Sequence, residues 1–197
     1  MAINEKDFQR WESLFLCEKI RQRSDMGKSL LILGAGGHGR VIEETAVAIK
    51  DEKGENVYGK IDFLDDQSER AVGRLSDLEH IGCNYDEVFC GIGNNQIRES
   101  LHKKVEASGY VIPVLIHPRA YVSPSASIGR GSIIEPGALV NANAVIGEGC
   151  ILSVGSIVDH DVTVEAYAHV NAGAVCKAGS RVEKGQKIDA GVIVENK

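Results

Sequence analysis

The sequence predicts a mixed fold, in which a small N-terminal α/β domain of Rossmann-like βαβ type precedes a parallel β-helix of hexapeptide repeats. One observation is a six-residue period from Ile116 to Val194, whose marker position is a branched aliphatic residue except at Cys176. Another is a short apolar run, residues 29–33, that leads into a glycine-rich loop and then a helical pattern. These patterns divide the 197 residues into an N-terminal helical extension (1–27), an α/β domain (28–115) and the β-helix (116–197).

In most units of the repeat, a small residue stands two places before the aliphatic and a glycine three places after it. Three such units make one triangular coil of a parallel β-helix, with the aliphatic and the small residue pointing inward. Glycine suits a turn with a positive φ, where a Cβ is costly. The period therefore predicts a columnar core and places a turn in every unit.

Residues 4–24 carry apolar residues at roughly helical spacing among many charges, which predicts a short amphipathic helix. The positions are Phe8, Trp11, Leu14, Phe15 and Ile20.

Strand, glycine loop and helix follow one another from residue 29 to about residue 50. Gly34, Gly36 and Gly39 have the GxGxxG spacing, which lets backbone amides approach a phosphate at the positive end of a helix. The same glycines also occur where a helix only has to pack on a strand. His38 and Arg40 favour the anion site, since both could face an anion from the loop.

The rest of the α/β domain is predicted as strands at 57–64, 87–92 and 111–116, with a helix at 96–108. The first of these strands ends in Asp65, where a doubly wound fold places an acidic residue near a ribose or base. Ile97, Leu101 and Val105 are expected on the buried face of the helix. A domain of about 90 residues fits one nucleotide better than two.

Composition limits the function and the compartment. The net charge of -6 and the pI near 5.5 argue against nucleic-acid binding, but allow a local basic pocket for one phosphorylated metabolite. Five scattered cysteines indicate neither a disulfide framework nor a zinc site, and favour a reducing, cytoplasmic location. No apolar run reaches the roughly 18 residues of a membrane span.

One polar cluster interrupts the turn column of the repeats, because Asp161 and Tyr167 stand where glycine or asparagine is usual. His160 is suited to act as a general base, with either Asp159 or Asp161 fixing its tautomer. His169 could approach it only through the coil or from a neighbouring subunit. Two alternatives stay open: a solvated surface histidine, and a metal site shared between subunits.

Several stretches together resemble a known family: residues 34–39 (GAGGHG), 63–66 (FLDD), 91–98 (GIGNNQIR), 116–118 (IHP), 158–161 (VDHD) and 168–170 (AHV). They resemble the left-handed β-helix sugar acetyltransferases, which include bacterial UDP-4-amino-sugar N-acetyltransferases and sialic-acid O-acetyltransferases. The resemblance implies a homotrimer that binds acetyl-CoA between adjacent β-helices and a nucleotide-sugar on the N-terminal domain.

The resemblance also implies roles for individual residues. His160 would be the general base, Asp161 its orienting partner, and His169 a wall of the acetyl-CoA site. A backbone amide at Ala178 or Gly179 would donate to the thioester oxygen. On the nucleotide-sugar side, the matching residues are Gly36, Gly37 and His38 at the phosphates and Asp65 near the base or ribose.

The sequence thus predicts direct acetyl transfer to the amino group of a nucleotide-linked amino-deoxy sugar in bacterial surface-glycan biosynthesis, with no metal. A sugar hydroxyl, as in sialic-acid O-acetylation, is the alternative acceptor. The repeats stop at Lys197, before the further coils that such enzymes usually have. A non-catalytic trimeric scaffold is therefore a third hypothesis.

Overall fold

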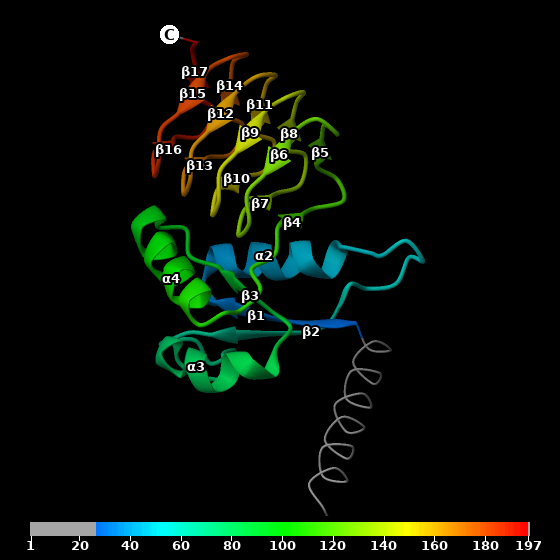
Figure 1. Cartoon of the computed structure of the whole chain (residues 1–197), viewed down its shortest axis with the longest axis vertical. Helices are drawn as coiled ribbons and strands as arrows, with labels where there is room; N and C mark the ends of the chain where they lie inside the picture. The colour runs from blue at the N-terminus through cyan, green and yellow to red at the C-terminus, as the bar shows by residue number, and fades with distance from the viewer. Residues whose placement is uncertain (1–26, 197) are drawn as a thin grey trace, which may run out of the picture.

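The computed structural model describes residues 27–196, so the predicted N-terminal helix lies outside the described residues. The chain forms an α/β domain and a β-helix that stands on it (Figure 1). The α/β domain has a three-stranded parallel sheet of order β2-β1-β3. In chain order its elements are β1 (Lys28–Leu33), α2 (Gly37–Ala48), β2 (Tyr58–Leu64), η1 (Leu75–Asp77), α3 (Leu78–Ile81), η2 (Gly82–Asn84), β3 (Glu87–Cys90) and α4 (Asn95–Ala107).

The β-helix is a triangular column of two-residue parallel strands. Its first face contains β4 (Leu115–Ile116), β7 (Ile133–Ile134), β10 (Ile151–Leu152), β13 (His169–Val170) and β16 (Lys187–Ile188). Its second face contains β5 (Tyr121–Val122), β8 (Leu139–Val140), β11 (Ile157–Val158), β14 (Val175–Cys176) and β17 (Ile193–Val194). Its third face contains β6 (Ser127–Ile128), β9 (Val145–Ile146), β12 (Thr163–Val164) and β15 (Arg181–Val182).

The predicted core and turn columns are confirmed. The inward aliphatic and small residues from Ile134 to Ile188 form one buried cluster, as expected when each coil stacks on the next. Positive φ values occur at the predicted glycines and, from residue 131 onward, also at the non-glycine residues of the same column, Asn143, Asp161 and Tyr167. We call the turns between the first and second faces the first edge, those between the second and third faces the second edge, and those between the third and first faces the third edge.

Two expectations for the domain junction were wrong. Within the predicted strand 111–116 only Leu115 and Ile116 are β-strand, and they pair with β7, so they belong to the β-helix. On α4, Leu101 and Val105 are buried as expected, but Ile97 is 51% exposed. The buried face of α4 instead carries two polar side chains, which are described below.

The outer side of the first face packs against the α/β domain. Leu115, Ile133 and Ile151 join one buried cluster with Ile42 and Ala46 of α2. Burying apolar area from both parts in one cluster fixes how they sit relative to each other.

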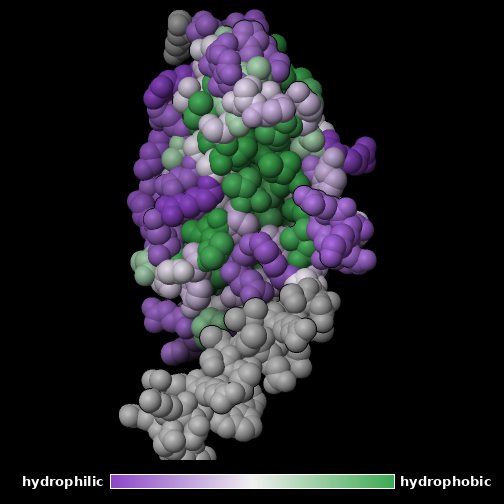
Figure 2. All heavy atoms as spheres, turned by 45° about the vertical axis from the view of Figure 1, so that its right-hand side comes forward, coloured by the Kyte–Doolittle hydropathy of each residue, from purple (hydrophilic) through white to green (hydrophobic). Residues whose placement is uncertain are grey.

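The second face has no such cover in the described chain. Its outward side chains Tyr121, Leu139, Ile157 and Ile193 are exposed, and Figure 2 shows a hydrophobic patch on this part of the molecule. A contiguous exposed apolar patch of this kind marks an interaction surface. Across residues 27–196 no helix is long and apolar enough to cross a membrane.

Candidate active site

The glycine loop between β1 and α2 presents free backbone amides. The N–H groups of residues 36–39 donate no hydrogen bond within the described chain, and a Cβ built on Gly36 or Gly37 would meet open space. They lie at the positive end of a 12-residue helix, which attracts anions. Gly39 has a different task, because its Cβ would lie 2.0 Å from the Gly34 carbonyl oxygen. It lets α2 pack closely on β1, as the packing hypothesis expects of this glycine, while the anion site at Gly36 and Gly37 stays a prediction.

Asp65 lies against this loop, and its carboxylate is largely occupied. One oxygen accepts the amide of Ala35 at 2.9 Å, and the other accepts the amides of Gln67 and Ser68 at 2.8 and 2.9 Å. These bonds, that from Ala35 first, lower the pKa of the carboxyl group. Asp65 therefore holds the shape of the glycine loop.

His38 turns away from the loop amides and toward the β-helix. Its Nδ1 lies 3.7 Å from Oε1 of Glu135 on the first edge, and its Nε2 is buried without a partner. Burial, with the nearby Arg98 and His169, lowers the pKa of His38 to about 4. The side chain is therefore neutral at pH 7, and its place at the phosphates stays a prediction.

His169 occupies the same region between the two parts. Its Nε2 lies 2.9 Å from the Ser153 hydroxyl, and its buried Nδ1 has no partner. Burial, with Arg98 and Lys187, lowers the pKa of His169 to about 4. A neutral imidazole with one unpartnered ring nitrogen can still bond to a ligand.

Sequence reasoning missed two residues of this region, Glu135 and Ser153. Glu135 is buried, and its Oε2 accepts the amide of Val154 at 2.9 Å. Burial raises the pKa of its carboxyl group. The signal in the sequence is weak: each polar residue directly follows an inward aliphatic, where many surface residues also occur.

His160 lies on the second edge, where its side chain is 54% exposed. Its Nδ1 lies 2.7 Å from Oδ2 of Asp161, and this bond raises the pKa of the imidazole. With Nδ1–H donating to the carboxylate, Nε2 is left as the proton acceptor. Asn143, one coil earlier, donates to the other oxygen of Asp161 at 3.2 Å.

Of the two acids considered as partners, the structure pairs Asp161 with the imidazole. Oδ1 of Asp159 accepts the backbone amide of His160 at 2.7 Å and the Asn141 side chain at 3.1 Å. Asp159 therefore holds the turn.

The next coil places Ala178 and Gly179 beside His160. The amide of Gly179 donates to the carbonyl oxygen of His160 at 3.0 Å, so it is not available to a ligand. The amide of Ala178 donates no hydrogen bond within residues 27–196. Of the two backbone amides expected to donate to the thioester oxygen, only that of Ala178 is therefore available. Gly179 instead holds successive coils together.

His160 and His169 do not meet within one chain. The second edge is opposite the first face in the triangular cross-section, and these two elements carry His160 and His169 respectively. Tyr167, which interrupts the same turn column as Asp161, lies on the third edge and is 2% exposed. The two residues that interrupt the glycine column therefore lie in different places: Asp161 is on the second edge beside His160, and Tyr167 is buried on the third edge. Among the described residues, no group of three His, Cys, Asp or Glu side chains is arranged to hold a metal ion.

Comparisons with known proteins match both parts of the chain. A family model described as the PglD N-terminal domain matches residues 29–105. The UDP-N-acetylbacillosamine N-acetyltransferase of Bacillus subtilis (strain 168) is 33% identical over 116 residues, or 54% of this chain and 51% of that protein. The match to this curated relative thus spans about half of its length.

Solved structures extend the match over the β-helix. The acetyltransferase domain of PglB from Neisseria gonorrhoeae FA1090, in complex with acetyl coenzyme A, is 35% identical with a TM-score of 0.79, covering 85% of this chain and 82% of that chain. A perosamine N-acetyltransferase from Caulobacter crescentus, in complex with CoA and GDP-perosamine, is 26% identical with a TM-score of 0.73, covering 85% and 89%. With its α/β domain, its hexapeptide column and these likenesses, the chain belongs to the left-handed β-helix sugar acetyltransferases.

Proposed function

We propose that this chain transfers an acetyl group from acetyl-CoA to the amino group of a nucleotide-linked amino-deoxy sugar, for a bacterial surface glycan. The contact between His160 and Asp161 on an exposed turn carries the proposal, because it leaves Nε2 free as a base in reach of solvent and ligands. The relatives named above act on amino sugars by their names, which favours an amine over a hydroxyl acceptor.

On the nucleotide side, the free amides at Gly36 and Gly37 would receive the phosphates at the start of α2. Asp65 would keep that loop in shape.

On the coenzyme side, acetyl-CoA supplies the acetyl group as an activated thioester. Nε2 of His160 accepts a proton from the amino nitrogen as that nitrogen bonds to the acyl carbon, and Asp161 supports the resulting imidazolium. The amide of Ala178 donates to the acyl oxygen as charge develops there. His160 then returns the proton to the departing CoA sulfur.

The transfer would be direct. Cys150 and Cys176 are fully buried, and burial raises the pKa of each thiol to about 11. They are therefore core residues, unsuited to form an acyl-enzyme at neutral pH.

A homotrimer would complete the site. His160 lies on the opposite side of one chain from His38 and His169, so an adjacent copy has to bring them together. The exposed apolar second face gives such copies a surface to bury. The proposal places the enzyme in the cytoplasm. The cysteines of the described chain are all unpaired, as is usual in a reducing compartment.

The test is His160→Ala, with His80→Ala on the exposed face of α3 as the matched control. We expect kcat to fall by about 10²–10⁴-fold for His160→Ala, the usual range for a general base, while light scattering shows an intact trimer. Turnover like that of the wild type would refute the assignment. Mass spectrometry of products from an acceptor panel separates amine from hydroxyl acetylation. Absence of heat on titration with acetyl-CoA would favour the non-catalytic scaffold.

A further inference from the structure

The buried polar face of α4 joins the α/β domain to the β-helix. Arg98 and His102 lie one turn apart on this helix, with 1% and 0% of their surface exposed. They face the third edge of the β-helix, where Tyr167 lies. Neither polar residue was needed to explain the proposed chemistry.

The Arg98 guanidinium group bonds to both parts of the chain at once. Nε donates to the carbonyl oxygen of Gly149 at 2.7 Å, and Nη2 donates to those of Tyr167 and Ala168 at 2.9 and 3.5 Å. On the α/β side, the acceptors are the carbonyl oxygens of Ile92 and Gly93, at 3.1 and 3.3 Å, and Oδ1 of Asn95, at 2.9 Å. Burial lowers the pKa of Arg98 to about 10, so the group remains charged at neutral pH.

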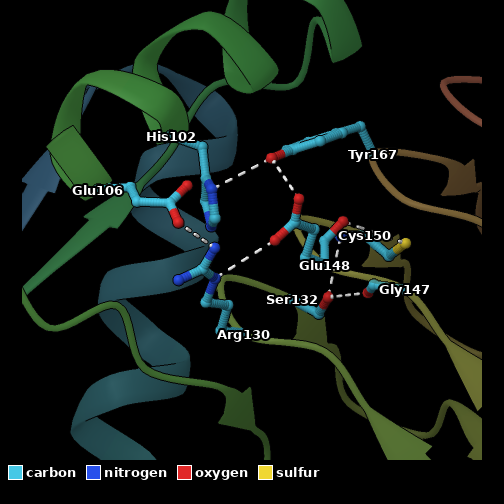
Figure 3. Close-up of polar contacts among 8 residues, drawn as sticks. All are labelled: His102, Glu106, Arg130, Ser132, Gly147, Glu148, Cys150 and Tyr167. Atoms are coloured by element: carbon cyan, nitrogen blue, oxygen red, sulfur yellow. Dashed lines mark hydrogen bonds and ion pairs between the residues drawn. The ribbon is translucent and has the colours of Figure 1, made fainter.

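The conformation of Tyr167 places its backbone carbonyl oxygen where Nη2 of Arg98 can donate to it. Tyr167 has φ 60°, a conformation that costs a non-glycine residue about 1 kcal/mol or more. Its buried hydroxyl donates to Glu148 at 3.0 Å and lies 3.2 Å from Nδ1 of His102 (Figure 3). Arg130 bonds both Glu148 and Glu106 at the rim of this cluster. The side chain therefore holds a strained turn against α4.

The two sets of acceptors adjoin the two proposed substrate sites. Ile92 and Gly93 follow β3 at the carboxyl edge of the sheet, where open α/β sheets bind their ligands. This loop touches the glycine loop, since a Cβ on Gly34 would meet the Ile92 side chain at 2.5 Å. Tyr167 and Ala168 directly precede His169.

We propose that Arg98 is a positioning residue for acetyl transfer, which fixes the nucleotide-sugar pocket at a set distance and angle from the coenzyme wall at His169. This inference rests on the proposed function. The planar guanidinium group, with five N–H donors, can bond to the α/β domain and to the β-helix in fixed directions. A lysine ammonium group is a single point charge and cannot hold two segments in one orientation. A misplacement of about 1 Å between reacting groups can cost about 100-fold in rate.

The experiment compares Arg98→Lys and Arg98→Met with Val105→Ala, a control on the same helix. Val105 is fully buried in the α/β core, so its truncation lowers stability and leaves the Arg98 contacts in place. We expect kcat to fall about 10- to 100-fold in both Arg98 variants, and less than threefold in the control. Calorimetric Kd values for acetyl-CoA and for the nucleotide-sugar should stay within about twofold of the wild type.

A second measurement does not depend on turnover. In a crystal structure of Arg98→Met superposed on the β-helix, loop 91–94 should be displaced relative to the wild type. An unmoved loop, an unchanged kcat, or a loss explained entirely by weaker binding would overturn the proposal. Failure of both variants to fold would also overturn it, by making Arg98 a folding residue. A wild-type chain that acetylates no acceptor would instead count against the proposed function, and the loop displacement would still decide the role of Arg98.

Discussion

Asp161→Asn is the sharpest test of the proposed dyad, because it removes the charge and keeps the turn. Asp161 has φ 59°, and Asn143 adopts φ 58° at the equivalent place one coil earlier, so asparagine fits this backbone without added strain. The 2.7 Å contact to His160 loses its ionic character, while the base itself remains. Both side chains are more than half exposed, so water can replace part of the lost support. We therefore expect kcat to fall roughly 10-fold, less than on removal of the base.

The pH profile gives the sign of the effect. Asp161 raises the pKa of His160, and the neutral imidazole is the active form, so kcat/KM rises as pH passes upward through that pKa. Loss of the carboxylate lowers the pKa and moves the acid limb to lower pH. Asp159→Asn is the control. It should move the acid limb of the pH profile less than Asp161→Asn does, because the hydrogen bond to Asp161 is the larger cause of the raised pKa of His160. A limb that stays in place or moves to higher pH in Asp161→Asn would refute the pairing.

Three further predictions concern assembly, packing and acid stability. Ile157→Glu on the exposed second face should convert the proposed trimer to monomers in light scattering, whereas Thr163→Glu on the third face should leave it intact. Gly39→Ala should prevent folding or lower Tm sharply, because its Cβ would clash with the Gly34 carbonyl, and Gly37→Ala should leave Tm nearly unchanged because nothing lies within 4 Å; equal Tm values would contradict the assigned roles. Burial lowers the pKa of His169 from 6.5 to about 4, so its contribution to stability is full above pH 6.5 and is lost as pH falls toward 4. His169→Gln should therefore flatten part of the fall in Tm between pH 6.5 and 4, and an unaltered slope would show that this imidazole does not titrate on unfolding.

Much of the fold follows from the sequence because the repeat is local. A six-residue period fixes which side chains point inward, and even the non-glycine turn residues, such as Tyr167, fall in the predicted column. The face of α4 could not be predicted in this way. Ile97 has the right spacing for burial, but the carbonyl groups that make Arg98 the better buried residue come from turns about 50 and 70 residues away.

The candidate site shows the same limit. The sequence predicts a contact between His160 and Asp161, since a histidine and an acid are adjacent on one turn, and the structure has this contact. It did not show that the Gly179 amide is already bonded to the next coil, or that His38 is turned toward Glu135. Both facts depend on contacts between segments that are distant in the sequence.

Arg98 bonds to two successive coils, at Gly149 and Tyr167, and so fixes which coils of the column lie beside the α/β domain. Every other coil then lies at a fixed distance from that domain. Partner residues on one face are 18 positions apart, as Ile151 and His169 are, and neighbouring strands are separated by about 4.8 Å. An inserted segment that continues the column keeps each later residue on its own face only if it adds a whole coil of 18 residues, so the distance between the α/β domain and a given residue on the second edge can change only in steps of that size. Enzymes built on this plan would therefore adapt to longer or shorter acceptors by discrete jumps, each requiring the α4 contacts to be made again on a different pair of turns.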